Sequence, residues 1–332
     1  MFQNHIHNMR GLAILGIVGA HSIHAFDWAG SPTLQRAFDT LCNQSSVLFF
    51  FIAGYLFQFL SARWSYQPYL KKKFQTVVLP YLILSVPALL FYTVMQQSND
   101  RVDDAVFYGQ PVWQQVLVYL GTGKHLAPFW FVPTITLFYL VSPFLLFMDR
   151  KGWWLPILPV LIAYSAYAGR DLLYGPFGKS TYLLSVYVLG MTFSRHRDRA
   201  EALATKWIWP LMVAEISLFA WNTFDADAHH SVLYFQKLVL IPVMVHWLKV
   251  FDQQLGKRLD HLAATSFGLF FVHGYLIHAA RVAWTRLVEP QLPAAALWNY
   301  LPFAAVVLLL SLGILSLAQR TLGARSRMVV GC

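Results

Sequence analysis

Residues 10–27 read RGLAILGIVGAHSIHAFD, an apolar run that follows an arginine and contains two histidines. The run resembles the core of a signal peptide, but His21 and His24 interrupt it and no small-x-small cleavage site follows. We therefore expect these residues to stay in the protein as a first membrane span.

The rest of the chain has the same apolar character. Of its 332 residues, 57% are hydrophobic and 12% are charged, whereas soluble domains carry about 25% charged residues. The net charge of +10 comes from short basic clusters between apolar runs, which argues against nucleic-acid binding because that function needs a basic face. The 2 cysteines are too few for a disulfide framework or a zinc site, and we expect no bound metal.

Apolar runs of membrane-spanning length recur along the whole sequence. A hydrocarbon core about 30 Å thick needs roughly 20 apolar residues per helix. The sequence therefore predicts an all-α polytopic membrane protein, a single domain over residues 1–332, with about ten transmembrane helices. The expected spans are 11–27, 45–62, 76–95, 129–148, 154–169, 180–194, 207–223, 232–249, 263–280 and 298–318.

Basic residues predict the orientation of these spans. If the N-terminus is cytoplasmic, seventeen lysines and arginines lie on the inner side and seven on the outer side, with Lys237 inside a span. The positive-inside rule then favours N-in and C-in. Cys42 and Cys332 would lie on opposite faces and could not pair. The longest outer loop, 96–128, is a candidate functional segment, and part of it, 111–120, is apolar enough to lie along the interface.

Ionisable side chains inside the expected spans are functional candidates, because burying them in a bilayer is costly. His21 follows Arg10 by eleven residues, which returns it to nearly the same helix face about 16 Å along the axis. An anion held at the inner surface by Arg10 could thus present its far end to His21, although a packing histidine is the alternative. His273 follows Ser266 by seven residues, and both side chains could line a polar cavity.

Two other charged groups have structural interpretations. Glu215 and Lys237 lie in adjacent spans, so we expect a buried ion pair with a structural role. Lys71, Lys72 and Lys73 precede the third span, where they are either positive-inside anchors or a phosphate-binding cluster.

Five motifs occur in order along the chain: Arg10 with His21, FFFIAGYL at 49–56, KKKF at 71–74 before Pro80, FWFVP at 129–133 and SFGLFFVH at 266–273. The ordered set resembles the acyltransferase-3 family of integral membrane proteins, bacterial enzymes that mostly O-acylate surface polysaccharides and lipid-linked glycans. Three features depart from the family: lysines replace paired arginines before the third span, Ala53 replaces a serine and Phe270 replaces a tyrosine.

The resemblance implies an acyl-CoA donor, most often acetyl-CoA, and a carbohydrate or lipid-linked glycan as the alcohol acceptor, in the bacterial cytoplasmic (inner) membrane. His21 would be the general base or would accept the acyl group covalently. The phosphates of coenzyme A would bind Arg10, Arg63, Lys71, Lys72 and Lys73. The acceptor cavity would be lined by Tyr55, Trp130, Ser266 and His273.

A transporter or flippase for a glycan or lipid is the main rival, with the buried histidines and lysines as a proton relay. Prolines 133, 143 and 242 lie within spans, but no repeat relates the two halves. A non-catalytic scaffold would explain the topology but not the pairing of Arg10 with His21. We therefore favour the enzyme.

Overall fold

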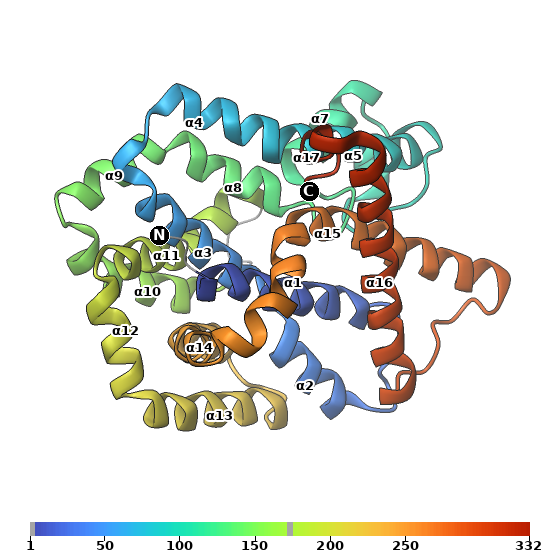
Figure 1. The fold of residues 1–332 in the computed structure, drawn as a ribbon. Helices are drawn as coiled ribbons and strands as arrows, with labels where there is room; N and C mark the ends of the chain where they lie inside the picture. Colours follow the sequence, from blue (N-terminus) through green and yellow to red (C-terminus); the bar gives the residue numbers. More distant parts are fainter. Residues whose placement is uncertain (1–3, 171–174) are drawn as a thin grey trace.

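The computed structural model describes residues 4–170 and 175–332, and the regular elements in these ranges are helices (Figure 1). One isolated bridge joins Asp27 to Ala294. The predicted all-α class is confirmed. The main helices are α1 (Asn4–Ile23), α2 (Pro32–Cys42), α3 (Ser46–Phe59), α4 (Tyr66–Lys73), α5 (Leu79–Leu89), α6 (Asp104–Phe107), α7 (Val112–Thr122), α8 (Phe131–Leu140), α9 (Ser142–Arg150), α10 (Trp154–Ala168), α11 (Gly175–Arg195), α12 (Arg197–Lys206), α13 (Ile208–Phe224), α14 (His230–Val250), α15 (Asp252–Leu287), α16 (Leu297–Leu322) and α17 (Ser326–Val329).

Several of these helices can cross a membrane. Among the described residues five stretches are long and apolar enough: Pro32–Phe59, Tyr66–Val94, His230–Val250, Arg258–Leu287 and Leu297–Val329. The number rises to 7 if two bent pairs, α8 with α9 and α12 with α13, each form one span. The chain is therefore an integral membrane protein, and the count of ten spans stays a prediction.

The expected spans missing from this set have identifiable features. α1 and α11 contain 20 and 21 residues, but polar side chains lower their mean hydropathy. α10 is apolar but has 15 residues. The two bent pairs turn by 56° and 74°, and the first of these breaks just before Pro143, whose ring cannot continue the hydrogen bonding of α8.

α1 and α15 pack side by side near the middle of the fold, while α13 and α16 lie at its periphery (Figure 1). Contacts advance along both helices in the same direction, from Asn4 with Asp252 to His21 with His273. The helices approach closely at Gly11, where a Cβ would lie 3.1 Å from the Leu259 carbonyl oxygen. This parallel pairing joins the first and ninth of the expected spans.

Two further glycines of α1 allow the junction between α2 and α3 to approach it. A Cβ on Gly16 would lie 2.3 Å from Ser45 Oγ, and one on Gly19 would lie 2.8 Å from Cys42 Sγ. Glycine at these positions keeps the helix thin enough for a close neighbour, and that neighbour is the segment 42–45.

α3 and α11 form a second close pair. A Cβ on Gly54 would lie 2.0 Å from the Tyr187 carbonyl oxygen, and one on Gly190 would lie 2.1 Å from that of Phe51. Small residues at such a crossing let two backbones touch. The packing of α11 against α3 therefore depends on glycine at both positions.

The predicted ion pair between Glu215 and Lys237 is wrong. Lys237 Nζ instead donates to the carbonyl oxygens of Thr40 (2.7 Å) and Leu41 (3.0 Å), while Glu215 accepts from Gln236. The last carbonyls of a helix lack partners within it and carry partial negative charge, so the end of α2 takes the ammonium group. The sequence did not predict this helix.

Candidate active site

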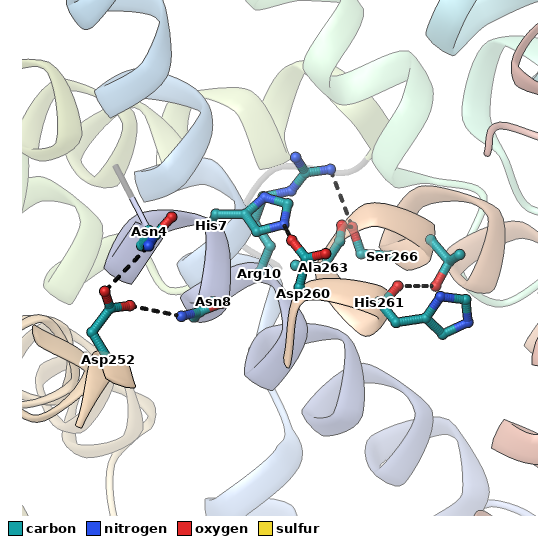
Figure 2. A network of polar contacts seen from close by, with 10 residues as sticks. Asn4, His7, Asn8, Arg10, Asp252, Asp260, His261, Ala263 and Ser266 are labelled. Carbon is teal, nitrogen blue, oxygen red and sulfur yellow. Dashed lines mark hydrogen bonds and ion pairs between the residues drawn. The ribbon is translucent and has the colours of Figure 1, made fainter. Parts of the chain in front are cut away.

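Polar side chains near the start of α1 connect it to α15 (Figure 2). Asn4 and Asn8 each donate to Asp252 at 3.2 Å, and His7 donates to Asp260 at 3.1 Å. Farther along, Arg10 donates to Ser266 Oγ at 3.1 Å. Two residues that belong to separate sequence motifs are thus in direct contact.

Arg10 has no acidic partner within ion-pair distance in the described part of the chain. Its guanidinium group is partly buried, and the charges of Lys73 and Arg327 are close enough to repel it. Arg10 and Lys73 are partly buried and Arg327 is exposed, and clustered cations that are partly desolvated are unfavourable without a counter-charge. An anionic group bound among these three residues, which we call the inner cation cluster, would relieve the repulsion.

The other predicted phosphate-binding residues differ in orientation. Lys73 turns inward, with Nζ 5.5 Å from the ring centre of Tyr69 and 4.9 Å from that of Tyr139. Lys71, Lys72 and Arg63 are exposed to the surroundings. The structure therefore brings Lys73, rather than the whole lysine run, next to Arg10.

His21 of α1 lies against His273 of α15, with ring centres 5.2 Å apart. His273 is fully buried, and its Nδ1 lies 2.8 Å from the Leu269 carbonyl oxygen. A carbonyl oxygen can only accept, so Nδ1 carries the proton and Nε2 of a neutral ring carries a lone pair. In the part of the chain that is described, Nε2 has no hydrogen-bond partner. A buried acceptor without a donor is unusual and marks this position as a candidate for chemistry.

Two adjoining cavities of about 450 and 490 Å³ share His21, His24, Arg101 and Ala127 as lining residues. Trp130 forms part of the first cavity. The Trp130 ring lies 4.6 Å from the Arg170 guanidinium and 4.7 Å from Lys179 Nζ. His21 is therefore partly open to a space bounded by an aromatic ring and several cations, which we call the outer cavities.

The structure separates the remaining predicted residues from these cavities. Tyr55 is buried among Phe51, Phe59 and Phe193 and lines neither cavity. Ser266 contacts Arg10 in the inner cation cluster instead. The stretch of α1 between Arg10 and His21 includes Ala13 and Ile14, which are completely buried.

Sequence reasoning missed five cations that line the outer cavities. They come from separate segments, and the sequence showed them only as members of the smaller, outer set of basic residues. These residues are Arg101, Lys124, Arg170, Lys179 and Arg281.

The loop 96–128, expected to be functional, supplies part of this wall. Asn99 fixes its fold by donating to Tyr119 Oη at 3.1 Å and to the Lys124 carbonyl oxygen at 3.3 Å. Gly123 adopts a left-handed φ of +73° and lies where a Cβ would be 2.4 Å from the Trp130 backbone nitrogen. The loop thereby fixes the position of Trp130. Its apolar segment forms α7, whose Trp113 is 61% exposed, and the interfacial location stays a prediction.

His125 connects the same loop to α5, and its burial predicts that the stability of the protein depends on pH. Its Nε2 lies 2.8 Å from Ser85 Oγ and its Nδ1 lies 3.1 Å from the Tyr119 carbonyl oxygen. Burial, assisted by the charge of Arg101, lowers the pKa of His125 from 6.5 to about 4. Between these values the unfolded chain binds more protons than the folded protein, so stability falls as the pH falls from 6.5 to 4.

We expect this single group to account for a loss of about 3 kcal/mol at most. Thermal unfolding of the detergent-solubilised protein, recorded from pH 7 to 4, measures the effect. His125→Gln should show a shallower pH dependence than the wild type. An unchanged slope in that variant would contradict the prediction.

Comparison with known proteins agrees with the motifs. A family model described as an acyltransferase domain matches residues 4–318, a range that contains Arg10, His21, Trp130, Ser266 and His273. Comparison with the curated proteins and with the solved structures finds no match. Because the family model covers nearly the whole chain, including both helices that carry the paired histidines, this protein belongs to the acyltransferase-3 family of membrane acyltransferases.

Proposed function

We propose that the protein transfers an acyl group, acetyl in the simplest case, from cytoplasmic acyl-CoA to a hydroxyl group of an envelope carbohydrate. In this proposal it lies in the bacterial inner membrane with ten spans and both ends in the cytoplasm. The transferase class follows from the family, whereas the donor, the acceptor and the topology belong to the proposal.

The parallel α1–α15 pair is the observation that supports this function most directly. One pair of contacts, Arg10 with Ser266, lies about 16 Å along α1 from the other, His21 with His273. Coenzyme A has phosphates at one end and a long pantetheine arm that ends in the thioester. Phosphates bound to the inner cation cluster would direct that arm toward His21. Because Ala13 and Ile14 are buried between the two ends, the arm would have to displace the side chains that cover this part of α1.

His21 would act as the general base. An imidazole can take the proton of the acceptor hydroxyl as its oxygen attacks the thioester carbonyl carbon. Collapse of the tetrahedral intermediate breaks the carbon–sulfur bond, and the leaving thiolate takes the proton back from His21. The products are an O-acyl ester and free coenzyme A, so atoms and charge balance.

His273 would position His21. Its unpartnered Nε2 can accept a hydrogen bond from one nitrogen of His21. That bond would leave the other nitrogen of His21 unprotonated and directed at the acceptor. Leu269 fixes the His273 tautomer through its carbonyl oxygen, much as a carboxylate fixes the histidine of a hydrolase triad.

Transfer from radiolabelled acetyl-CoA tests the function. The purified protein in lipid nanodiscs is incubated with the labelled donor and an envelope glycan extract, and both thiol release and label on carbohydrate are measured. We expect both. If acetyl-CoA neither binds nor turns over while longer acyl-CoA donors and acylated lipids also fail, the donor proposal is wrong and glycan transport becomes the better hypothesis.

Replacing Arg10 tests the inner cation cluster. Loss of one charge-assisted hydrogen bond to a phosphate is worth about 1.5–3 kcal/mol, so Arg10→Ala should raise the KM for acetyl-CoA roughly 10- to 100-fold. Its kcat should change much less. Arg10→Lys keeps the charge but loses the bidentate geometry, and should fall between the two.

A matched control is Lys151→Ala, which removes an exposed cation after α9. It should leave the KM for acetyl-CoA unchanged. Equal effects of both alanine variants would mean that Arg10 contributes only to the general surface charge, and the assignment of the donor phosphates would fail.

A further inference from the structure

Several cations gather around the outer cavities. The first cavity has four of them in its wall, and the second has Arg101 and Arg281. Among the described lining residues, Asp100 of the second cavity is the acidic one, and it is exposed. Cations therefore outnumber acidic groups among the described lining residues.

Three of these cations have no ion pair among the described residues. Arg101, Lys124 and Arg281 lack a salt bridge to any described acidic side chain, whereas Arg195, outside the cavities, pairs with Asp149 at 3.1 Å. Arg101 and Arg170 are close enough to His21 for their charges to act on its ring. Like charges gathered in a partly buried space repel one another, and a bound anion would remove that cost.

The other side chains of the first cavity suit a carbohydrate. Trp130 contributes an aromatic side chain that can contact the apolar part of a sugar, and its ring lies 4.6 Å from the Arg170 guanidinium and 4.7 Å from Lys179 Nζ. Gln44, in the same wall, has an unusual positive φ of +57° and is held by a 2.6 Å hydrogen bond from Tyr182. A strained backbone of this kind persists only where the surrounding structure holds the residue in place. Gln44 is such a residue, and it lines the first cavity.

We propose that the acceptor is an anionic carbohydrate. Its phosphate or carboxylate binds Arg101 and Lys124, its sugar ring contacts Trp130, and a hydroxyl group next to the anion reaches His21, because all four residues line the first cavity. This inference rests on the proposed function, because it names the substrate class of the same site. It also assigns different substrates to two sets of cations. The inner cation cluster binds the phosphates of the donor, and the cations of the outer cavities bind the acceptor.

Binding without any acyl donor tests the proposal separately from catalysis. The affinities of glucose 1-phosphate, glucuronate and glucose are measured by thermophoresis for the protein in phosphatidylcholine nanodiscs. We expect both charged sugars to bind at least about tenfold more tightly than glucose, and the difference to shrink as salt rises. Equal affinities for all three sugars would overturn the proposal.

Single substitutions test which cation binds the anionic group of the sugar. Arg101→Gln should weaken glucose 1-phosphate binding about tenfold, and Arg101→Lys should recover most of it. Arg286→Gln, which removes an exposed cation of α15 outside both cavities, should bind like the wild type. The proposal fails if Arg286→Gln is as damaging as Arg101→Gln, or if Arg101→Lys is no better than Arg101→Gln.

Two competition experiments distinguish other sources of the anion. If phosphatidylglycerol nanodiscs abolish glucose 1-phosphate binding, a lipid headgroup is the occupant and the proposal is wrong. If coenzyme A displaces glucose 1-phosphate equally well in Arg10→Ala and in the wild type, the outer cations bind the donor instead, which also overturns it. Thiol release stimulated as strongly by glucose as by glucose 1-phosphate would exclude the anionic acceptor while leaving the acyltransferase function intact.

Discussion

Replacing His21 with alanine is expected to lower the kcat of acyl transfer by about 10²- to 10⁴-fold, the usual contribution of a general base. The expectation follows from geometry: His21 is partly open to both outer cavities, and it lies against the buried ring of His273. Thiol release from acetyl-CoA measures the loss. Binding of labelled acetyl-CoA should persist in His21→Ala, because the phosphates are held at Arg10.

A matched control for this variant is His261→Gln, which changes an exposed histidine of α15. It should retain wild-type turnover. Substantial activity in His21→Ala would contradict the assignment of the base. Isolation of an acyl group bound to His21 would instead replace direct transfer with a two-step covalent mechanism.

Introducing a methyl group at Gly54 is expected to give the largest loss of stability among single substitutions considered for this fold. In Gly54→Ala the new Cβ would lie 2.0 Å from a backbone oxygen of α11, and a backbone atom cannot rotate away as a side chain can. Forced separation of two packed helices typically costs about 1–3 kcal/mol. Thermal unfolding in detergent should show a clear decrease in midpoint temperature, and Gly190→Ala should behave similarly.

Gly313 supplies the comparison, because it lies in α16 and a Cβ there would meet nothing within 4 Å. Gly313→Ala should leave stability unchanged or raise it slightly, since alanine favours helix by up to about 1 kcal/mol. If Gly54→Ala and Gly313→Ala unfold at the same temperature, the close approach of α3 and α11 does not contribute to stability.

The sequence predicts the helical class because the apolar runs are long and continuous, and lipid leaves few other ways to satisfy their backbones. It is less informative about the number of spans. Helix α1 combines a polar N-terminal half with an apolar C-terminal half, and the break before Pro143 divides one expected span into two short helices. Helix α2 was missed because residues 32–42 contain too few apolar side chains for a span, and this omission led to the wrong partner for Lys237.

The sequence also predicts parts of the site. The helical repeat places Arg10 and His21 on one face of the first helix. It also places Ser266 and His273 on one face of a second helix late in the chain. No local pattern shows that these two faces meet, because that contact joins positions far apart in the chain. The convergence of Arg101, Lys124 and Arg170 was also invisible, since loops have no periodicity from which the direction of a side chain can be derived.

The pairing of α1 with α15 has a consequence for biosynthesis. Arg10 and Ser266 are separated by 256 residues, and translation proceeds at about 5–20 residues per second. A growing chain therefore holds its first helix for roughly 10–50 s before the partner helix is synthesised. During that interval the guanidinium and imidazole groups of the nascent first helix lack their final neighbours. Catalytic competence is thus acquired near the end of synthesis, and a chain truncated before residue 273 would insert helices into the membrane without forming the histidine pair.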